Sequence, residues 1–198
     1  IPHFVIFKNR ETTQNWRVFH QYGYLSGTYG QYQSGGRLNS TAAWDQGAGS
    51  YFQSLPFTTK TIPLGTSTEV NESGKKFIAY CWTEIEGFSK FGSYKANNDH
   101  DGPFIYLGFK PAFFMMKGLS SGARWMLYDN KRNPHNPTQN SLDAQSTDAE
   151  NTSTENAIDF LSNGVKIRDV TNNNINYSSQ YYVYMAWAEM PFKYATAK

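Results

Sequence analysis

The stretch KKFIAYCWTEIEGFSKFGSYKANNDHDGPFIYLGFKPAFFMMK, residues 75–117, contains the strongest β-strand pattern in the first half of the chain. It reads as four strands in a row, and two parts of it recur elsewhere. The segment KFIAYCWTEI at residues 76–85 returns as YYVYMAWAEM at residues 181–190, and PAFFMMK at residues 111–117 repeats the opening PHFVIFK of residues 2–8. Such an internal repeat decides the fold, because each copy forms the same supersecondary unit.

The repeated residues keep a constant spacing. Pro2, Phe4 and Trp16 each recur 109 positions later, whereas Trp82 and Glu84 recur 105 positions later. The spacing changes once, by four residues, in the loop-rich middle of the unit. Unrelated strands also share Val, Ile, Tyr and Phe, but a run of Pro, Trp and Glu matches in the same order favours duplication. We therefore predict two copies of one β-rich unit.

The two predicted units differ at their N-terminal ends. The second unit, residues 88–198, opens with a lead-in that runs to residue 109, and nothing before Ile1 corresponds to it. In the first unit, residues 1–87, the lead-in strands are therefore expected to be missing or upstream. Residues 191–194, PFKY, resemble the start of a further lead-in. The chain is expected to be the C-terminal part of a longer polypeptide or a processed product, packed as one compact body.

Composition and periodicity indicate an all-β protein. Aromatic residues make up 17% of the 198 residues, charged residues make up 17%, and turn-forming residues separate the apolar runs. We predict two tandem, duplicated, jelly-roll-like β-sandwich units with only short helices. One such helical turn is expected at residues 39–44, with a counterpart near residues 146–150. Both faces of the strand around Tyr80 are apolar, which predicts a strand covered on both sides and a buried, inert Cys81.

The composition also excludes several classes of function. The net charge is only +2, which argues against nucleic acid as a partner. No apolar run approaches 18 residues, so membrane insertion is not expected. The four histidines, His3, His20, His100 and His135, have no metal-ligand spacing, and the common catalytic motifs are absent. We expect neither a cofactor nor a catalytic or metal site.

Two features of the sequence suggest the alternative of a catalytic site or a metal site. Glu84 and Glu189 are equivalent acidic residues, and a carboxylate pair is typical of glycosidases. We favour a structural role, in which each carboxylate closes its own unit with a lysine such as Lys8 or Lys117. The loop NNDHDG at residues 97–102 offers oxygen ligands for calcium. Because Asn, Asp and Gly also form ordinary tight turns, a turn is the preferred prediction there.

The best candidate for binding is a tyrosine-rich loop. Its sequence is YGYLSGTYGQYQ at residues 22–33, whereas KRNPHNP occupies the corresponding place at residues 131–137 of the second unit. Tyrosine rings offer flat apolar area with a polar tip, which suits sugars and protein surfaces. The candidate ligand-binding residues are Tyr22, Tyr24, Tyr29 and Tyr32. The alternative is that these rings only pack on their own subunit or on a neighbouring one.

Several segments together resemble a known family. They are YCWTEIEGFSKFGSY at residues 80–94, DGPF at 101–104, GFKPAF at 108–113, DFLSNGVKIR at 159–168 and YMAWAEMPFKY at 184–194. These words are similar to a β-rich domain that recurs in large virion structural proteins of tailed bacteriophages, notably marine ones. The loop at residues 22–36 departs from that pattern. The resemblance carries no catalytic residues, and it implies longer proteins with further copies of the unit.

The resemblance implies a place on the exterior surface of a virion and no enzymatic activity. The expected function is a tail fibre or spike module that binds host surface glycan through its loops. A capsid fibre or decoration protein that contacts only other virion proteins is the alternative, and a glycan-cleaving tailspike is a second alternative. The expected partners are other virion proteins, further copies of the same chain in a homo-oligomer taken to be a trimer, and host glycan.

Overall fold

The computed structural model describes residues 1–24, 33–45, 49–53, 55–120, 122–168, 174–177 and 180–190. Within these residues the regular structure is β-strand apart from 3-10 geometry at Gln33 and at η2, a single 3-10 turn at Thr154–Asn156. The strands form antiparallel sheets that pack as a β-sandwich, so the all-β prediction is confirmed.

The first unit contributes one four-stranded sheet. Its strands lie in the order β3-β2-β1-β4. Their bounds are β1 (Phe4–Asn9), β2 (Arg17–His20), β3 (Gly36–Arg37) and β4 (Phe77–Trp82). We call this sheet the first sheet.

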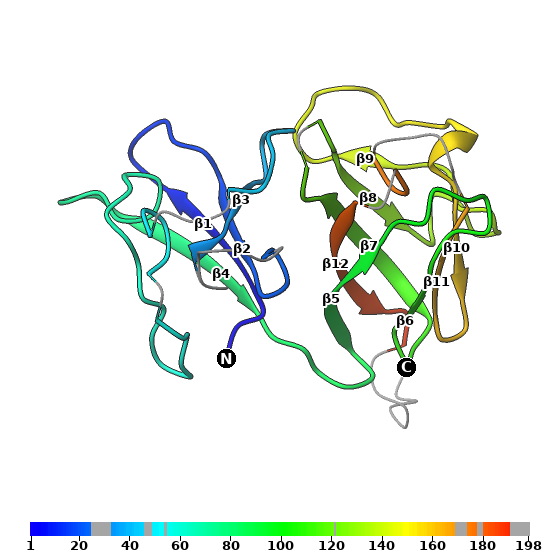
Figure 1. Cartoon of the computed structure of the whole chain (residues 1–198), viewed down its shortest axis with the longest axis horizontal. Coiled ribbons are helices and arrows are strands. Elements are labelled where there is room, and N and C mark those ends of the chain that lie inside the picture. Colours follow the sequence, from blue (N-terminus) through cyan, green and yellow to red (C-terminus); the bar gives the residue numbers. More distant parts are fainter. Residues whose placement is uncertain are drawn as a thin grey trace.

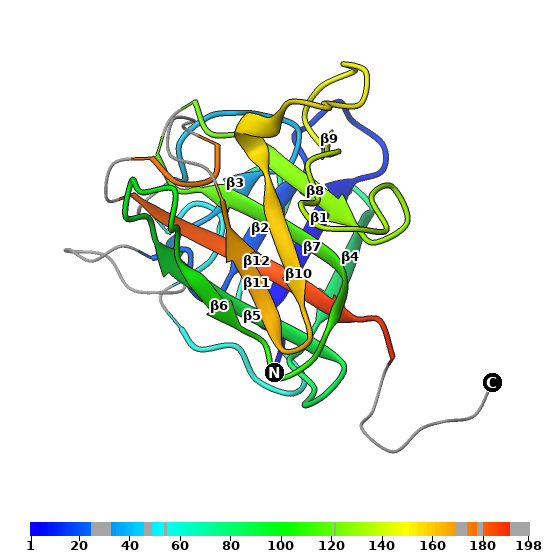
Figure 2. The same cartoon turned by 90° about the vertical axis from the view of Figure 1, so that its right-hand side faces the viewer.

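The second unit contributes two sheets. The second sheet has the order β5-β12-β7-β8-β9, with β5 (Ser89–Lys95), β7 (Pro111–Gly118), β8 (Trp125–Asp129), β9 (Leu142–Asp143) and β12 (Tyr181–Ala188). The third sheet has the order β10-β11-β6, with β6 (Phe104–Tyr106), β10 (Ile158–Leu161) and β11 (Gly164–Ile167). Figure 1 shows the three sheets as successive layers, with the second in the middle. In Figure 2 the third sheet lies in front of the second.

The pairing register repeats the spacing found in the sequence. The order β9-β8-β7-β12 in the second sheet reproduces β3-β2-β1-β4 in the first. Phe4 lies opposite Trp82, and Phe113, 109 positions after Phe4, lies opposite Trp187, 105 positions after Trp82. The two strand pairs therefore have the same register, and the duplicated framework predicted from the sequence is confirmed over these four strands.

Contacts outside the strands follow the same rule. An isolated bridge joins Gly35 to Asp45 in the first unit, and another joins Ser141 to Asn151, each 106 positions later. The backbone N–H of Trp16 donates a hydrogen bond to Asn39 Oδ1 (3.0 Å), and the backbone N–H of its counterpart Trp125 donates one to Gln145 Oε1 (2.8 Å). The duplication thus extends to the segments that connect the strands.

The core has three parts. One apolar cluster fills the sandwich between the second and third sheets, and a smaller cluster in the first unit occupies the equivalent place. A third cluster joins the units, because the same face of each repeated sheet, carrying Phe4 and Val18 in one and Phe113 and Leu127 in the other, packs against its counterpart. The two units therefore form one body.

The units differ at one edge. In the second sheet β12 lies between β5 and β7 and is buried along most of its length, as predicted. Among the described residues, its counterpart β4 pairs only with β1, and its four central residues are exposed. The prediction of a strand covered on both sides is wrong for β4. For the same reason Cys81 is exposed rather than buried.

The predicted helical turns are also absent. The Ser40 hydroxyl accepts the backbone N–H of Ala42 (3.1 Å), and Ser146 does the same for Asp148 (3.3 Å), so each capping residue is present. No helix follows, because residues 41–44 have no regular secondary structure and the Trp44 N–H donates to the backbone oxygen of Leu119. Tertiary hydrogen bonds override the local capping signal at these positions.

Candidate functional site

The tyrosine-rich loop connects β2 to β3 on the first unit. Tyr22 follows β2 directly and exposes 43% of its surface, and Tyr24 is half-buried. Tyr29 and Tyr32 lie outside the described residues. The structure thus places the first two predicted site residues at the start of the loop, on the side of the first unit where β2 ends.

A buried tryptophan closes the base of this loop. A Cβ added to Gly23 would lie 2.5 Å from the Trp44 indole, and one added to Gly36 would lie 2.6 Å from the same ring. Both ends of the loop therefore pass so close to Trp44 that only glycine fits. The described ends of the loop, which include exposed Tyr22, are therefore held on a rigid base, which is typical of binding loops.

His20 links Tyr22 to the second unit. Its ring is fully buried, Nε2 lies 3.1 Å from the backbone oxygen of Tyr184, and Nδ1 accepts the backbone N–H of Tyr22 (3.1 Å). These contacts require a neutral ring with the proton on Nε2. Burial lowers the pKa of His20 to about 3, even though the bond to Tyr184 opposes the shift. The histidine is a structural link here and not a metal ligand.

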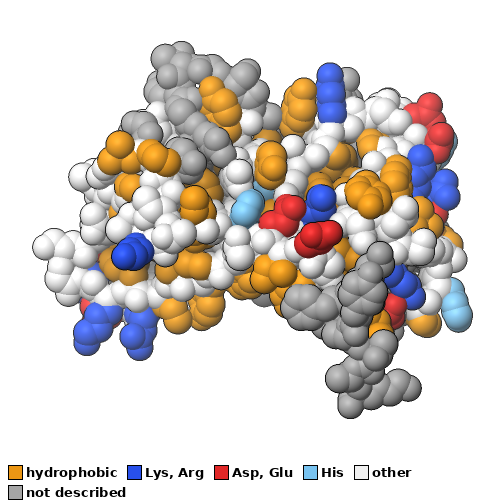
Figure 3. Space-filling model, turned by 90° about the horizontal axis from the view of Figure 1, so that it is seen from below, with side chains coloured by type: hydrophobic (Ala, Val, Ile, Leu, Met, Phe, Trp, Pro, Cys, Tyr) orange, Lys and Arg blue, Asp and Glu red, His pale blue; other side chains and the backbone are white. Residues whose placement is uncertain are grey.

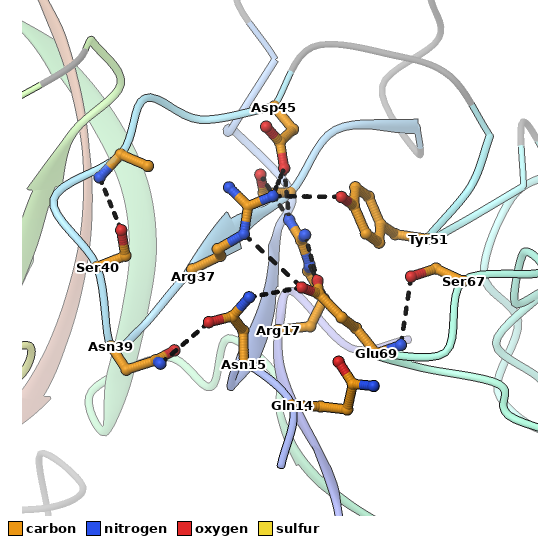
Figure 4. Close-up of polar contacts among 12 residues, drawn as sticks. Gln14, Asn15, Arg17, Arg37, Asn39, Ser40, Asp45, Tyr51, Ser67 and Glu69 are labelled. Carbon is orange, nitrogen blue, oxygen red and sulfur yellow. Dashed lines mark hydrogen bonds and ion pairs between the residues drawn. The ribbon is translucent and has the colours of Figure 1, made fainter. Parts of the chain in front are cut away.

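A buried ion-pair network fixes the strands beneath the loop (Figure 4). The Arg17 guanidinium is inaccessible to solvent, pairs with Asp45 (2.7 Å), binds Glu69 through two nitrogens, and stacks on the Tyr51 ring at 3.3 Å. Arg37 contacts Asp45 at 3.2 Å. The network therefore ties β2 and β3 to segments that are distant in the sequence.

The electrostatics of the ion-pair network indicate a structural role and not a catalytic one. Burial favours the neutral form of Glu69, but the hydrogen bond from Asn15 and the charge of Arg17 outweigh it and lower the pKa of that carboxyl. A carboxylate held ionised in this way is a poor general acid. Sequence reasoning missed this cluster. The available signal was Arg17 itself, a charged residue inside a short apolar strand where the second unit has Met126.

The equivalent loop of the second unit is built differently. Asn133 accepts the backbone N–H of Asn140 (2.7 Å), and Arg132 forms ion pairs with Asp129 (2.8 Å) and Glu150 (2.6 Å). Backbone hydrogen bonds from Lys131 and Arg132, together with the Arg132 charge, outweigh burial and lower the pKa of Asp129. One framework therefore carries an aromatic loop in the first unit and a polar, internally bonded loop in the second.

The prediction that Glu84 and Glu189 pair with Lys8 and Lys117 is wrong about the lysines. Glu189 binds Lys110 (2.7 Å), not Lys117. Lys117 is buried and donates to the backbone oxygen of Ala123, and Lys8 donates to the backbone of Asn9 (2.8 Å). Lys110 corresponds to Ile1, so the pair at Glu189 has no copy in the first unit.

The loop at residues 97–102 is a turn, as preferred. Asn97 Oδ1 accepts the N–H of Asp99 (3.2 Å), and Asp99 Oδ1 accepts the N–H of Asp101 (2.9 Å). Asp101 also pairs with Lys166 (2.6 Å), whose hydrogen bond lowers the pKa of that carboxyl. Among the described side chains, no group of three or more His, Cys, Asp or Glu residues could hold a metal ion.

A groove of about 1100 Å³ lies where the units are joined. It is lined by charged residues that include Glu84 and Lys90 and by apolar residues that include Tyr106 and Met190. Tyr106 and Met190 expose 61% and 62% of their surface. Figure 3 looks at the molecule from below and shows acidic and basic side chains together between hydrophobic ones. The mixture suits a protein surface better than a small charged ligand.

Comparison with known proteins gives one match. A family model described as Domain of unknown function (DUF7483) covers residues 1–191. No curated protein and no solved structure matches the chain. In the part of the chain that the structure describes, no helix is long and apolar enough to cross a membrane.

Proposed function

The chain belongs to the DUF7483 family of domains of unknown function, and we propose that it is a non-enzymatic structural module of a tailed-bacteriophage virion that binds host surface glycan. In this proposal it forms part of a tail fibre or spike on the exterior of the particle. The sequence resemblance to virion structural proteins supports the setting, and the loop between β2 and β3 supports the binding role.

The observation that carries the binding role is the contrast between the two units. Their four repeated strands share one order and one register, yet the loop at the same place is aromatic in one unit and polar in the other. A framework that is kept while one loop changes is the arrangement of binding proteins that present loops on a rigid scaffold. Tyr22, exposed above the rigid base at Trp44, can stack on a sugar ring.

Weak contacts of this kind gain strength by repetition. A shallow aromatic loop binds a single sugar weakly, but a homo-oligomer, here proposed to be a trimer, presents several loops to one cell surface. The second contact is then intramolecular, and overall avidity exceeds the affinity of each site by about 10²- to 10⁴-fold.

Binding to host cells and to a glycan array tests the proposal. Tyr22→Ala combined with Tyr24→Ala, and separately Tyr24→Ala combined with Tyr29→Ala, are expected to reduce binding by at least about tenfold, since each stacked ring contributes roughly 1–3 kcal/mol. Tyr177→Ala is the matched control, because Tyr177 is similarly exposed (41%) but lies in the second unit. Undiminished binding by both double variants would contradict the proposed glycan-binding site.

The groove at the junction of the units favours a second candidate, a capsid fibre or decoration protein. Exposed Tyr106 and Met190 beside charged side chains such as Glu84 and Lys90 resemble the core and rim of a protein contact. Locating the chain on intact particles separates the two, since the tail is expected for the first candidate and the capsid for the second. Release of reducing sugar from host envelope would instead indicate a glycan-cleaving tailspike.

A further inference from the structure

β4 is an edge strand, and the described part of the chain places no strand on its outer side. It is the last strand in the order of the first sheet, as Figure 1 shows. The Arg10 N–H donates to the backbone oxygen of Lys76 (2.9 Å) on the β1 side, and hydrogen-bonding direction alternates along a strand. Phe77, Ala79 and Cys81 therefore direct their backbone N–H and C=O groups outward. β4 also contains no charged residue, proline or bulge, the devices by which proteins usually prevent pairing at an edge.

The side chains of β4 are uncovered where those of its counterpart are buried. Ile78 and Tyr80 expose 38% and 43% of their surface. Their counterparts in β12, Val183 and Met185, are buried, and there β5 lies beside β12 and places Phe91 opposite Met185. The edge of β4 therefore fits an added strand that carries an aromatic residue opposite Tyr80.

Opposite charges flank β4. Lys76 precedes the strand and Glu84 follows it, and the alternation of side chains along a strand places both on the same face as Tyr80. The lysine is particular to the first unit, because Tyr181 stands at the equivalent position of the second. Lys76 exposes 75% of its side chain and approaches Glu11 only to 3.8 Å, so this surface pair holds it weakly. Lys76 is therefore able to bind another carboxylate.

Glu84 lacks the lysine that its counterpart has. Glu189 pairs with Lys110 (2.7 Å), but the residue equivalent to Lys110 in the first unit is Ile1. Glu84 is exposed, and it stays beside the chain that leads into β1, because its backbone N–H donates to His3 Nδ1 (3.2 Å). A carboxylate thus stands at one end of the edge and an ammonium at the other.

A second copy of the chain carries the complementary pattern. About a two-fold axis at Tyr80, two antiparallel copies of β4 place Lys76 of each opposite the partner's Glu84. The same arrangement places Ile78 opposite the partner's Trp82. We propose that β4 pairs in this register with β4 of a second copy and joins the two first sheets into one. A parallel arrangement would instead bring Lys76 against the partner's Lys76, so the charges specify the antiparallel one.

The partner's Tyr80 lies where Phe91 lies in the second unit. Phe91 is opposite Met185, the counterpart of Tyr80, and packs edge to face on Trp187 with ring centroids 5.6 Å apart. The counterpart of Trp187 is Trp82. The partner's Tyr80 is thus placed to contact Trp82 in the way that Phe91 contacts Trp187.

The backbone also allows this register. Ala79 lies opposite the partner's Cys81, and both residues direct their backbone groups outward, so they form a hydrogen-bonded pair. In the second unit this place is held by Gly92, where a Cβ would lie 2.5 Å from the Tyr184 hydroxyl. Ala79 stands in the place of Tyr184, which leaves room for the partner's cysteine side chain.

This pairing goes beyond the proposed function. A contact between two identical surfaces has two-fold symmetry and does not by itself build a trimer, so it is a second contact between copies. β4 lies at the opposite edge of the first sheet from β3, where the tyrosine-rich loop ends. Glycan binding and pairing through β4 are therefore measured independently, and the failure of one does not contradict the other.

Charge exchange tests the pairing, with the oligomeric state of the full chain measured by sedimentation equilibrium. The wild-type chain is expected to form dimers. Lys76→Glu and, separately, Glu84→Lys place like charges opposite each other at both ends of the paired strands, so each variant is expected to dimerise at least about tenfold more weakly. A mixture of the two variants is expected to recover dimers, because each introduced charge then meets an opposite one. Recovery also shows that both variants fold.

Lys60→Glu and Glu155→Lys are the matched controls. Both residues are exposed and lie outside β4 and its flanks, and each substitution changes the net charge as much as the corresponding test variant does. Both controls are expected to dimerise as the wild type does. A loss of dimers in either control would mean that net charge, and not the pairing of Lys76 with Glu84, controls association.

Disulfide crosslinking tests the register. Tyr80→Cys combined with Cys81→Ser places one cysteine on the two-fold axis, opposite its own copy in the partner, and copper–phenanthroline is expected to crosslink this double variant. In the wild type Cys81 lies opposite the partner's Ala79, so the Cα atoms of the two Cys81 residues are roughly 9 Å apart, beyond disulfide distance. The wild type is therefore expected to crosslink at least about tenfold more slowly.

Three results would overturn the inference. A wild-type chain that remains monomeric at high concentration would leave the edge to a different partner. Dimers that survive both charge changes, or that the mixture does not restore, would assign association to another surface. Faster crosslinking of the wild type than of the double variant would place Cys81 on the axis and separate Lys76 from the partner's Glu84.

Discussion

Trp82 and Trp187, equivalent residues of the two units, contact each other edge to face, with ring centroids 6.4 Å apart and ring planes at 75°. Each also packs on the equivalent phenylalanine of its own unit, Trp82 on Phe4 (5.2 Å) and Trp187 on Phe113 (5.6 Å). The residues that hold the framework of each unit therefore also join the units.

The first prediction concerns this junction. Trp187→Ala is expected to lower the free energy of unfolding by about 3 kcal/mol, because it removes contacts to Trp82, Phe91 and Phe113 at once. Urea unfolding measures the effect. Trp16→Ala is the control, since that ring lies at the surface, and it should cost less than about 1 kcal/mol. Equal costs would mean that the tryptophan pair does not hold the units together.

The second prediction uses the second unit as a template for the first. Arg17→Met places the residue found at the equivalent position 126 into the network and leaves Asp45 and Glu69 without their main partner. Uncompensated buried charge is costly, so the variant is expected to lose about 3 kcal/mol of unfolding free energy, measured by urea denaturation.

The matched variant converts the whole network. Arg17→Met with Asp45→Asn and Glu69→Asn introduces the residues that the second unit carries at positions 126, 151 and 174. Removing both signs of charge together is expected to recover at least about 2 kcal/mol of that loss. A triple variant as unstable as the single one would show that Arg17 acts through packing on Tyr51 and not through charge.

The framework was predictable because its signal is periodic. The matched positions of Phe4 and Phe113 and of Trp82 and Trp187 in the sequence are the residues that pair in the sheets. The sequence pattern does not show whether a strand is exposed. Alternating residue types assign each side chain to one face of the strand, but they do not show which other strand or sheet covers that face. Cys81 therefore looked buried, although the strand that covers its counterpart in the second unit has no described equivalent in the first.

The candidate site was predictable only in outline. Tyr22 was visible as part of an aromatic loop, but the contacts that fix its base join positions far apart in the chain. The Arg17 network spans residues up to Glu69, and His20 reaches Tyr184 of the other unit. Such pairs carry no local sequence pattern, so a single sequence does not reveal them.

The third prediction concerns acid. The pKa of His20 falls from 6.5 in the unfolded chain to about 3 in the fold, because burial disfavours the charged ring. Below pH 6.5 the unfolded state binds a proton that the folded state does not, so stability decreases as the pH falls toward 3. Between pH 7 and pH 4.5 this contributes a loss of about 2 kcal/mol.

The His20→Gln variant isolates this contribution. Although the substitution lowers stability overall, the difference in unfolding free energy between wild type and variant should shrink by about 2 kcal/mol over the same pH range. Chemical denaturation at a series of pH values measures it. A pH-independent difference for His20→Gln would contradict the neutral buried ring.

The last prediction concerns base. Burial lowers the pKa of Lys117 from 10.5 to about 8, and in the described structure its ammonium donates to the backbone oxygen of Ala123. Between pH 8 and pH 10.5 the unfolded chain keeps a proton that the folded chain has released. Stability from this group therefore rises with pH across that window, by up to about 3 kcal/mol. Lys117→Met removes the rise while filling the same space.

The duplication supplies the control for this experiment. Lys8 is the equivalent residue of the first unit, but it is half-buried and its ammonium reaches the backbone oxygens of Asn9 and Thr12. Lys8→Met, which replaces a lysine at the equivalent strand position, is therefore the matched variant. Guanidinium unfolding at pH 7.5 and at pH 10 measures how the unfolding free energy of each variant changes with pH relative to wild type. If the two variants show the same pH slope, burial is not what lowers the pKa of Lys117.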